Sequence, residues 1–136
     1  MYETFDHTAD LGLRIIAPDI DTLFAEAGTA LFSIIVEDST TIRAVSSFDI
    51  NIAGTDREYL LFDFLRELLY RFDAEQFLAA GFVVKLSGAG LFATISGEPF
   101  DAQRHLLNHE VKAITYHGLT VAETADGWVA EFIVDI

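Results

Sequence analysis

The sequence predicts an α+β fold: a single domain, residues 1-136, in which two amphipathic helices pack on a mostly antiparallel or mixed sheet of about six or seven strands. Two segments carry apolar residues at helical spacing, whereas the others alternate apolar and polar residues and are joined by short glycine-containing turns. Hydrophobic residues make up 51% of the chain and twelve residues are phenylalanine, so 136 residues can bury one core.

The first half of the chain predicts two strands, a helix and a third strand. The strands are expected at Tyr2 to His7 and Leu11 to Ala17, and Pro18-Asp19 marks the start of the helix. The third strand alternates apolar and polar residues and stops at Gly54. The apolar residues of the helix recur every three or four positions: Ile20, Leu23, Phe24, Ala27, Leu31 and Ile34.

A second helix follows a capping signal. Thr55 is expected at the N-cap with Glu58 three residues later, which is the spacing of a capping box. Glu67 and Arg71 lie one turn apart and can form an ion pair. The buried face of this helix is predicted to contain Leu61, Phe64, Leu65, Leu68 and Phe72.

Two hairpins are predicted in the second half. One joins Phe82 to Ser87 with Leu91 to Gly97, and the other joins Leu119 to Ala125 with Trp128 to Ile136. Between them, the segment from Glu98 to Gly118 fits neither the helical nor the strand period. Because a connection this long inside a compact domain is usually functional or disordered, and this one holds three of the four histidines, we expect contact chemistry there.

The charge balance limits the function. The chain has 22 acidic and 8 basic residues, a net charge of −14 at pH 7, so it is poorly suited to binding nucleic acid on its own. Divalent cations or a basic partner protein suit it better. The absence of cysteine, of a signal sequence and of an apolar run long enough for a bilayer predicts a cytoplasmic protein with no membrane association.

Carboxylates near the two ends of the sequence predict a cation site. Asp135 and the α-carboxylate of Ile136 end an apolar strand, and Asp10 lies beside strand residues near the other terminus. If these strands are neighbours, their oxygens converge, and like charges held close take up a proton or bind a cation. Oxygen-only sites favour Ca²⁺, Mg²⁺ or Mn²⁺ over zinc. Each aspartate alone could instead be a turn or solvent-facing residue.

Other polar residues give weaker signals. The histidines at 7, 105, 109 and 117 lack the paired spacing of a zinc helix, so each is expected to be a hydrogen-bonding or surface residue. Lys112 is one of two lysines among many acidic residues, and a salt bridge is about as plausible for it as a role on phosphate or a carboxylate. Neither a nucleophile elbow nor a phosphate-binding loop is visible, and no organic cofactor is expected.

Four segments in order along the chain resemble the archease family. They are His7-Thr8-Ala9-Asp10-Leu11-Gly12, Gly97-Glu98-Pro99-Phe100-Asp101, Val111-Lys112-Ala113-Ile114-Thr115-Tyr116-His117-Gly118-Leu119 and Phe132-Ile133-Val134-Asp135-Ile136.

The resemblance implies an accessory protein rather than an enzyme: an activator of an RtcB-type RNA ligase in tRNA splicing, which promotes guanylylation of the ligase histidine and multiple turnover. It implies a metal site at Asp10, Asp135 and Ile136 and an activating role for Lys112, and we place His117 and His7 with Lys112 as partner-facing candidates. RNA and GTP would be contacted only through the ligase. A metal-dependent phosphoester hydrolase and a general chaperone or scaffold are the alternatives.

Overall fold

The computed structural model describes residues 1–7 and 10–136 and confirms the α+β class, with two helices and seven strands in the described residues. The elements follow in the order β1 (Tyr2–His7), β2 (Asp10–Ala17), α1 (Ile20–Ile35), a short 3₁₀ turn (Ser39–Thr41), β3 (Ser46–Ala53), α2 (Arg57–Glu75), β4 (Phe77–Leu86), β5 (Gly90–Pro99), β6 (Ala113–Thr124) and β7 (Gly127–Asp135).

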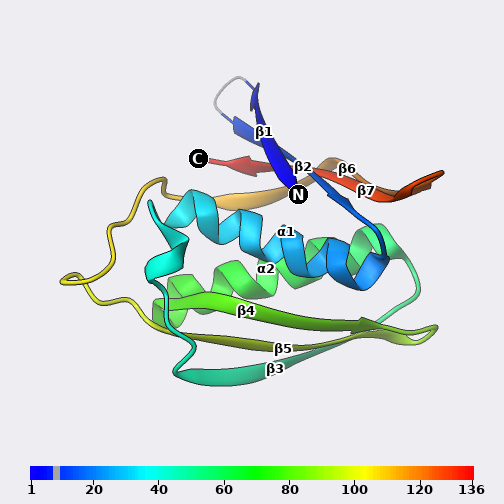
Figure 1. The fold of residues 1–136 in the computed structure, drawn as a ribbon. Helices are drawn as coiled ribbons and strands as arrows, with labels where there is room; N and C mark the ends of the chain where they lie inside the picture. Colours follow the sequence, from blue (N-terminus) through cyan, green and yellow to red (C-terminus); the bar gives the residue numbers. More distant parts are fainter. Residues whose placement is uncertain (8–9) are drawn as a thin grey trace.

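The seven strands form two antiparallel sheets, a division that the sequence did not predict. One sheet has the order β1-β2-β7-β6 and the other the order β3-β5-β4. Figure 1 shows α1 and α2 as a middle layer between the two sheets. Helix α1 packs against β4 on one side and β2 on the other, while α2 packs against β6 and β3. Both helices and both sheets therefore bury their apolar faces against one another in a single core.

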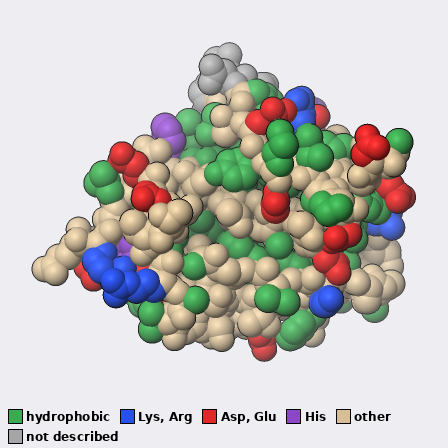
Figure 2. All heavy atoms as spheres, viewed as in Figure 1, with side chains coloured by type: hydrophobic (Ala, Val, Ile, Leu, Met, Phe, Trp, Pro, Cys, Tyr) green, Lys and Arg blue, Asp and Glu red, His purple; other side chains and the backbone are tan. Residues whose placement is uncertain are grey.

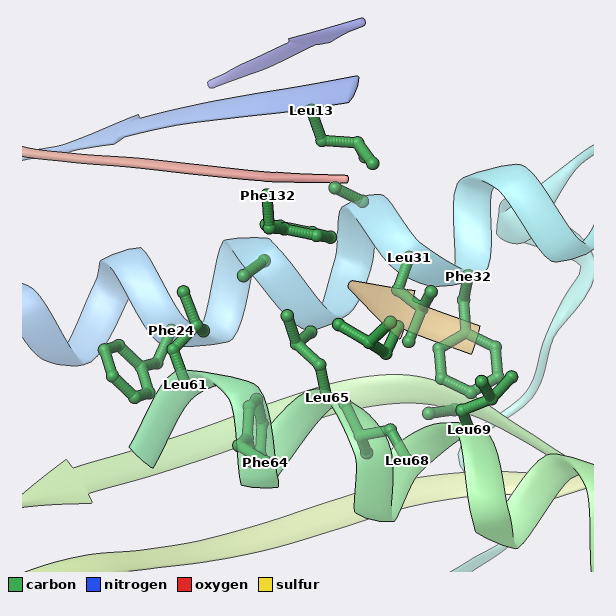
Figure 3. Close-up of a cluster of buried hydrophobic side chains, with 14 of the residues drawn as sticks. Leu13, Phe24, Leu31, Phe32, Leu61, Phe64, Leu65, Leu68, Leu69 and Phe132 are labelled. Carbon is green, nitrogen blue, oxygen red and sulfur yellow. The ribbon is translucent and has the colours of Figure 1, made fainter. Parts of the chain in front are cut away.

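The core lies around the helical layer. Figure 3 shows Leu13 and Phe132 of the four-stranded sheet pointing toward α1, and the apolar faces of α1 and α2 meeting below them. Of the residues predicted to form the buried face of α2, four are at most 1% exposed, and Phe72 is partly buried against them. The ring centroids of Phe24 and Phe64 lie 6.2 Å apart and connect the two helices.

The N-cap predicted for α2 is wrong by one residue. Asp56 is the N-cap, and its carboxylate accepts hydrogen bonds from the backbone N–H groups of Glu58 and Tyr59 at 2.9 and 3.1 Å. The Glu58 carboxylate instead accepts a hydrogen bond from the backbone N–H of Val121 in β6, at 3.1 Å. Because an aspartate takes the cap as readily as a threonine, the two adjacent candidates could not be separated by residue type. The predicted pair of Glu67 and Arg71 forms, at 3.4 Å.

The segment from Glu98 to Gly118 is less irregular than the sequence suggested. Strand β5 continues to Pro99 and β6 begins at Ala113, so the true connection is residues 100–112. Strand β6 is interrupted rather than regular: its register against β7 shifts between Thr115 and Thr120, which are paired with Ile133 and Glu131. Five residues along β6 thus correspond to two along β7. Because this bulge interrupts the alternation of apolar and polar residues, the first part of β6 could not be recognised as a strand from the sequence.

Candidate functional site

Asp10 and Asp135 lie directly opposite each other in the four-stranded sheet. They are register partners on the antiparallel strands β2 and β7, and the same row continues to His7 on β1 and Ala113 on β6. Opposed residues of an antiparallel pair place their side chains on the same face, with Cβ atoms about 5 Å apart. The predicted meeting of the two terminal segments is confirmed, and the two carboxylates share one face at one end of this sheet.

The face that carries these carboxylates is the one turned away from the helices. Along β7, Phe132 and Val134 are buried while Asp135 between Val134 and Ile136 is half-buried, as the alternation predicted. Gly12 lies two residues from Asp10 on the same strand, and a Cβ at this position would come within 2.1 Å of the Phe5 ring. The glycine therefore allows the Phe5 ring of β1 to lie over β2 beside the carboxylates.

Lys112 lies at the same end of the sheet. Its backbone N–H donates to the carbonyl oxygen of Asp135 at 2.7 Å, and its side chain is exposed. It is the last residue of the 100–112 connection. Its position therefore depends on how that connection is held.

The 100–112 connection is fastened to the end of α1. The backbone N–H groups of Asn108 and His109 donate to the carbonyl oxygens of Ile35 and Ile34 at 2.8 and 3.1 Å, which supplies partners for the last turn of the helix. Leu107 also forms a β-bridge with Val36. These bonds fix the backbone three residues before Lys112.

The start of the connection is held by a buried polar cluster. Glu98 and His105 are the buried polar or charged residues of the described chain, with 5% and 4% of their surfaces exposed. The Glu98 carboxylate accepts from the backbone N–H of Arg43 at 2.7 Å and is paired with the Arg104 guanidinium and with His105 Nε2, the latter at 2.9 Å. Arg104 also donates to the carbonyl oxygen of Thr41 at 3.2 Å.

These contacts fix the charge states of the cluster. Burial opposes ionisation of Glu98, but the hydrogen bonds from Arg43, Arg104 and His105 outweigh it and lower the Glu98 pKa from 4.5 to about 2. The backbone N–H of Asp101 donates to His105 Nδ1 at 2.9 Å. Nδ1 therefore carries no proton, and Nε2–H of the neutral imidazole donates to Glu98.

The histidines of this region thus divide into different roles. His105 is a buried structural residue, which agrees with its expected hydrogen-bonding role and corrects the expectation that the whole segment makes contact chemistry. His117 is exposed in the bulge of β6, beside Gly118 with φ of +77°. His7 is a backbone partner of Asp10, and Thr8 and Ala9 between them lie outside the described residues.

The β6 bulge is supported by aromatic contacts with α2. The Tyr116 ring stacks on Tyr59 with centroids 4.8 Å apart and meets Phe62 edge-on at 5.2 Å. Partial burial, together with the charges of Tyr59, Asp56 and Glu58, raises the pKa of Tyr116. His117 is thereby presented at the surface further along β6 than the carboxylate row.

The donor set at the end of the sheet suits a hard cation. Asp10, Asp135 and the carboxylate of Ile136 offer oxygen ligands only, which is the chemistry of Ca²⁺, Mg²⁺ and Mn²⁺ sites. Among residues 1–7 and 10–136, no group of three or more His, Cys, Asp or Glu side chains is placed to hold a metal ion. A cation here would therefore rest on two side chains, the main-chain carboxylate and water.

The sequence did not identify Glu98, Arg104 and His105 as one cluster. A signal was present, because Glu98 is a carboxylate in an otherwise apolar strand and is followed within seven residues by an arginine and a histidine. Buried carboxylates require such partners. The spacing crosses a turn, so periodicity could not connect them.

The remaining acidic residues form no single patch on the face seen in Figure 2, where they are spread among hydrophobic side chains. On this face the negative charge is therefore not confined to the carboxylate row. Among the described residues, no helix combines the length and apolar character needed to cross a membrane.

The chain is similar to proteins named archease over nearly all of its length. The model of the archease protein family matches residues 2–136. The chain is 37% identical to protein archease of Pyrococcus furiosus, covering 99% of this chain and 98% of that protein. It is 35% identical to protein archease of Methanopyrus kandleri, covering 99% of both.

A solved structure has the same fold. The solution structure of Methanobacterium thermoautotrophicum protein 1598 superposes with a TM-score of 0.88 at 32% identity, covering 99% of this chain and 98% of that one. On the sequence matches and on this shared fold, the chain belongs to the archease protein family.

Proposed function

We propose that this protein activates an RtcB-type RNA ligase by presenting the carboxylate row, with a bound divalent cation, to the active site of the ligase. The observation that carries the proposal is the register pairing of Asp10 with Asp135. The backbone N–H of Lys112 is hydrogen-bonded to the carbonyl oxygen of Asp135, at the same end of the sheet. Membership of the archease family supports an accessory role, and the chain itself supplies no enzymatic mechanism in the proposal.

Charge complementarity explains the proposed docking. A ligase that joins RNA ends with GTP handles polyanions, so its cleft must be basic and metal-loaded. An acidic end of a sheet on a protein with a net charge of −14 is attracted to such a cleft, which accelerates encounter and favours one orientation.

The cation and Lys112 would act on the nucleotide phosphates. A divalent ion held by Asp10, Asp135 and the Ile136 carboxylate supplies charge that neutralises phosphate oxygens during nucleotidyl transfer. Lys112 is exposed at the same end of the sheet and adds a second positive charge. We expect this protein to accelerate guanylylation of the ligase histidine. Repeated guanylylation then allows the ligase to complete multiple turnovers.

The test is a ligation assay with the cognate ligase at limiting concentration, with and without this protein. Asp135→Asn and Asp10→Asn should each lower the stimulation by about tenfold or more, equivalent to about 1.4 kcal/mol in the activated step. Asp126→Asn, in the β6–β7 turn, is the matched control and should stimulate as the wild type does.

Two further measurements separate docking from chemistry. Lys112→Met should reduce guanylylation, whereas Lys85→Met, the other lysine, should not. Calorimetric titration with Ca²⁺ and Mn²⁺ should show binding that Asp135→Asn weakens. Full stimulation by the folded Asp135→Asn protein would overturn the proposal, and phosphoester hydrolysis by the isolated protein would favour an enzyme instead.

A further inference from the structure

A groove lies between β3 and α2, and it involves the sheet that does not carry the carboxylate row. Its volume is about 710 Å³. One wall is the edge of β3, where residues 49–53 line it consecutively. The other wall is one face of α2, where Asp63, Arg66, Glu67 and Tyr70 recur at helical spacing.

Strand β3 is an open sheet edge. In the order β3-β5-β4, β3 has a strand neighbour on one side only. The other edge, β4, is protected: it packs closely against α1, it has a register shift between Ala79 and Gly81, and it carries Lys85. Residues 46–53 of β3 contain no proline, no lysine and no register shift, which are the usual devices against strand addition.

The groove also has outward-facing backbone groups. The N–H of Gly54 donates to the carbonyl oxygen of Ala89 at 3.0 Å, next to the pairing of Ala53 with Gly90. Hydrogen bonding alternates along an antiparallel pair, so the even-numbered residues of β3 bond to β5. The backbone N–H and C=O groups of Asp49 and Asn51 then face away from β5, toward the open side.

The walls of the groove favour a positively charged occupant with apolar side chains. Asp49, Asp63 and Glu67 contribute three carboxylates and Arg66 one guanidinium. Because Glu67 is also paired with Arg71 at 3.4 Å, Asp49 and Asp63 carry most of the excess negative charge. The partly buried Ile52 adds apolar surface, and Tyr70 is 61% exposed at the α2 wall. An exposed aromatic ring beside an open strand offers contact area at little entropic cost.

We propose that this groove binds an extended segment of a partner protein, rich in lysine or arginine, that adds to β3 as a further strand. Main-chain hydrogen bonds to Asp49 and Asn51 would supply affinity without regard to sequence, as in strand addition to PDZ domains. The carboxylates on α2 and β3 would select basic side chains. The site is on the other sheet from Asp10 and Asp135, so it can act whether or not the carboxylate row binds a cation.

The decisive variant is Asn51→Pro, with Asn51→Ala as its matched control. Proline removes the outward N–H of residue 51, and it is tolerated on an edge strand where that N–H takes no part in the ladder. Alanine removes the same side chain and keeps the N–H. Thermal unfolding of both variants checks that the sheet is intact.

The probe is a library of random twelve-residue peptides displayed on phage and selected against the full chain. We expect selected peptides to be basic, to bind the Asn51→Ala protein, and to lose at least about tenfold in affinity for Asn51→Pro. Added salt, and the double substitution Asp49→Asn with Asp63→Asn, should each weaken the binding of these peptides further. Amide resonances of residues 49–53 should shift and gain protection from exchange when a synthetic peptide is added.

Any of four results would overturn the proposal. The first is a set of peptides that bind Asn51→Pro and wild type equally, and the second is the absence of any binding peptide. The third is a set of acidic or helical peptides. The fourth is a concentration-dependent dimer, seen by light scattering, that Asn51→Pro abolishes; it would assign the β3 edge to a second copy of this chain.

Discussion

Replacing Glu98 by glutamine tests the buried cluster that holds the 100–112 connection. The substitution keeps the size of the side chain and removes the charge that Arg104, His105 and the backbone N–H of Arg43 stabilise. The Glu98 pKa falls from 4.5 to about 2, a difference of about 2.5 pH units at 1.36 kcal/mol each. The ionised carboxylate therefore contributes at most about 3 kcal/mol to the free energy of unfolding.

The pH dependence of this contribution has a definite sign. The pKa is lower in the folded protein than in the unfolded chain, so the stabilisation is fully present above about pH 4.5 and is lost as the pH falls toward 2. The difference in unfolding free energy between wild type and Glu98→Gln should lie between about 1 and 3 kcal/mol at pH 7 and should shrink through this window.

Urea denaturation followed by the fluorescence of Trp128, the single tryptophan, measures that difference at each pH. Glu123→Gln, at an exposed position of β6, is the control and should stay within about 0.5 kcal/mol of the wild type. A Glu98→Gln difference that is below about 1 kcal/mol at pH 7, or that does not change between pH 5 and pH 2, would refute the charge assignment.

Three further predictions concern two tightly packed positions and the charge beside Tyr116. Gly12→Ala should destabilise the protein by about 1–3 kcal/mol in urea denaturation, because its Cβ would meet the Phe5 ring, whereas Gly88→Ala, with no atom within 4 Å, should be neutral. Phe132→Ala should cost about 3–5 kcal/mol in the same assay, since this ring is fully buried between β7 and α1. Glu58→Gln should lower the Tyr116 pKa toward its ordinary value in an ultraviolet absorbance titration, because the Glu58 charge helps to raise it, and an unchanged or higher pKa would contradict this contribution.

Much of the fold could be predicted because strong local periodicity coincides with burial. The two-residue alternation of β7 and the three-to-four-residue spacing of α1 each describe one buried face, and each matches the structure. The division into two sheets could not be predicted in this way. Periodicity identifies which face of a strand is buried, but it does not identify the neighbouring strand.

The candidate site was predictable in part for the same reason. An apolar strand that runs to residue 135 must dock somewhere, and this led to the expectation that Asp135 lies near Asp10, which the register confirms. The cluster of Glu98 and His105 depends instead on the path of a connection without a period, so it emerged only from the structure. Metal binding and the roles of Lys112, His117 and His7 stay predictions.

The irregular stretch of β6 has a consequence for the behaviour of the protein in concentrated solution. Strand β6 forms the outer edge of its sheet, and the stretch between Thr115 and Thr120 breaks the even spacing that an incoming strand would need. Shortening this stretch by three residues would straighten the edge over its whole length. Such a shortened protein should form fibrils or precipitate at concentrations at which the natural chain stays clear.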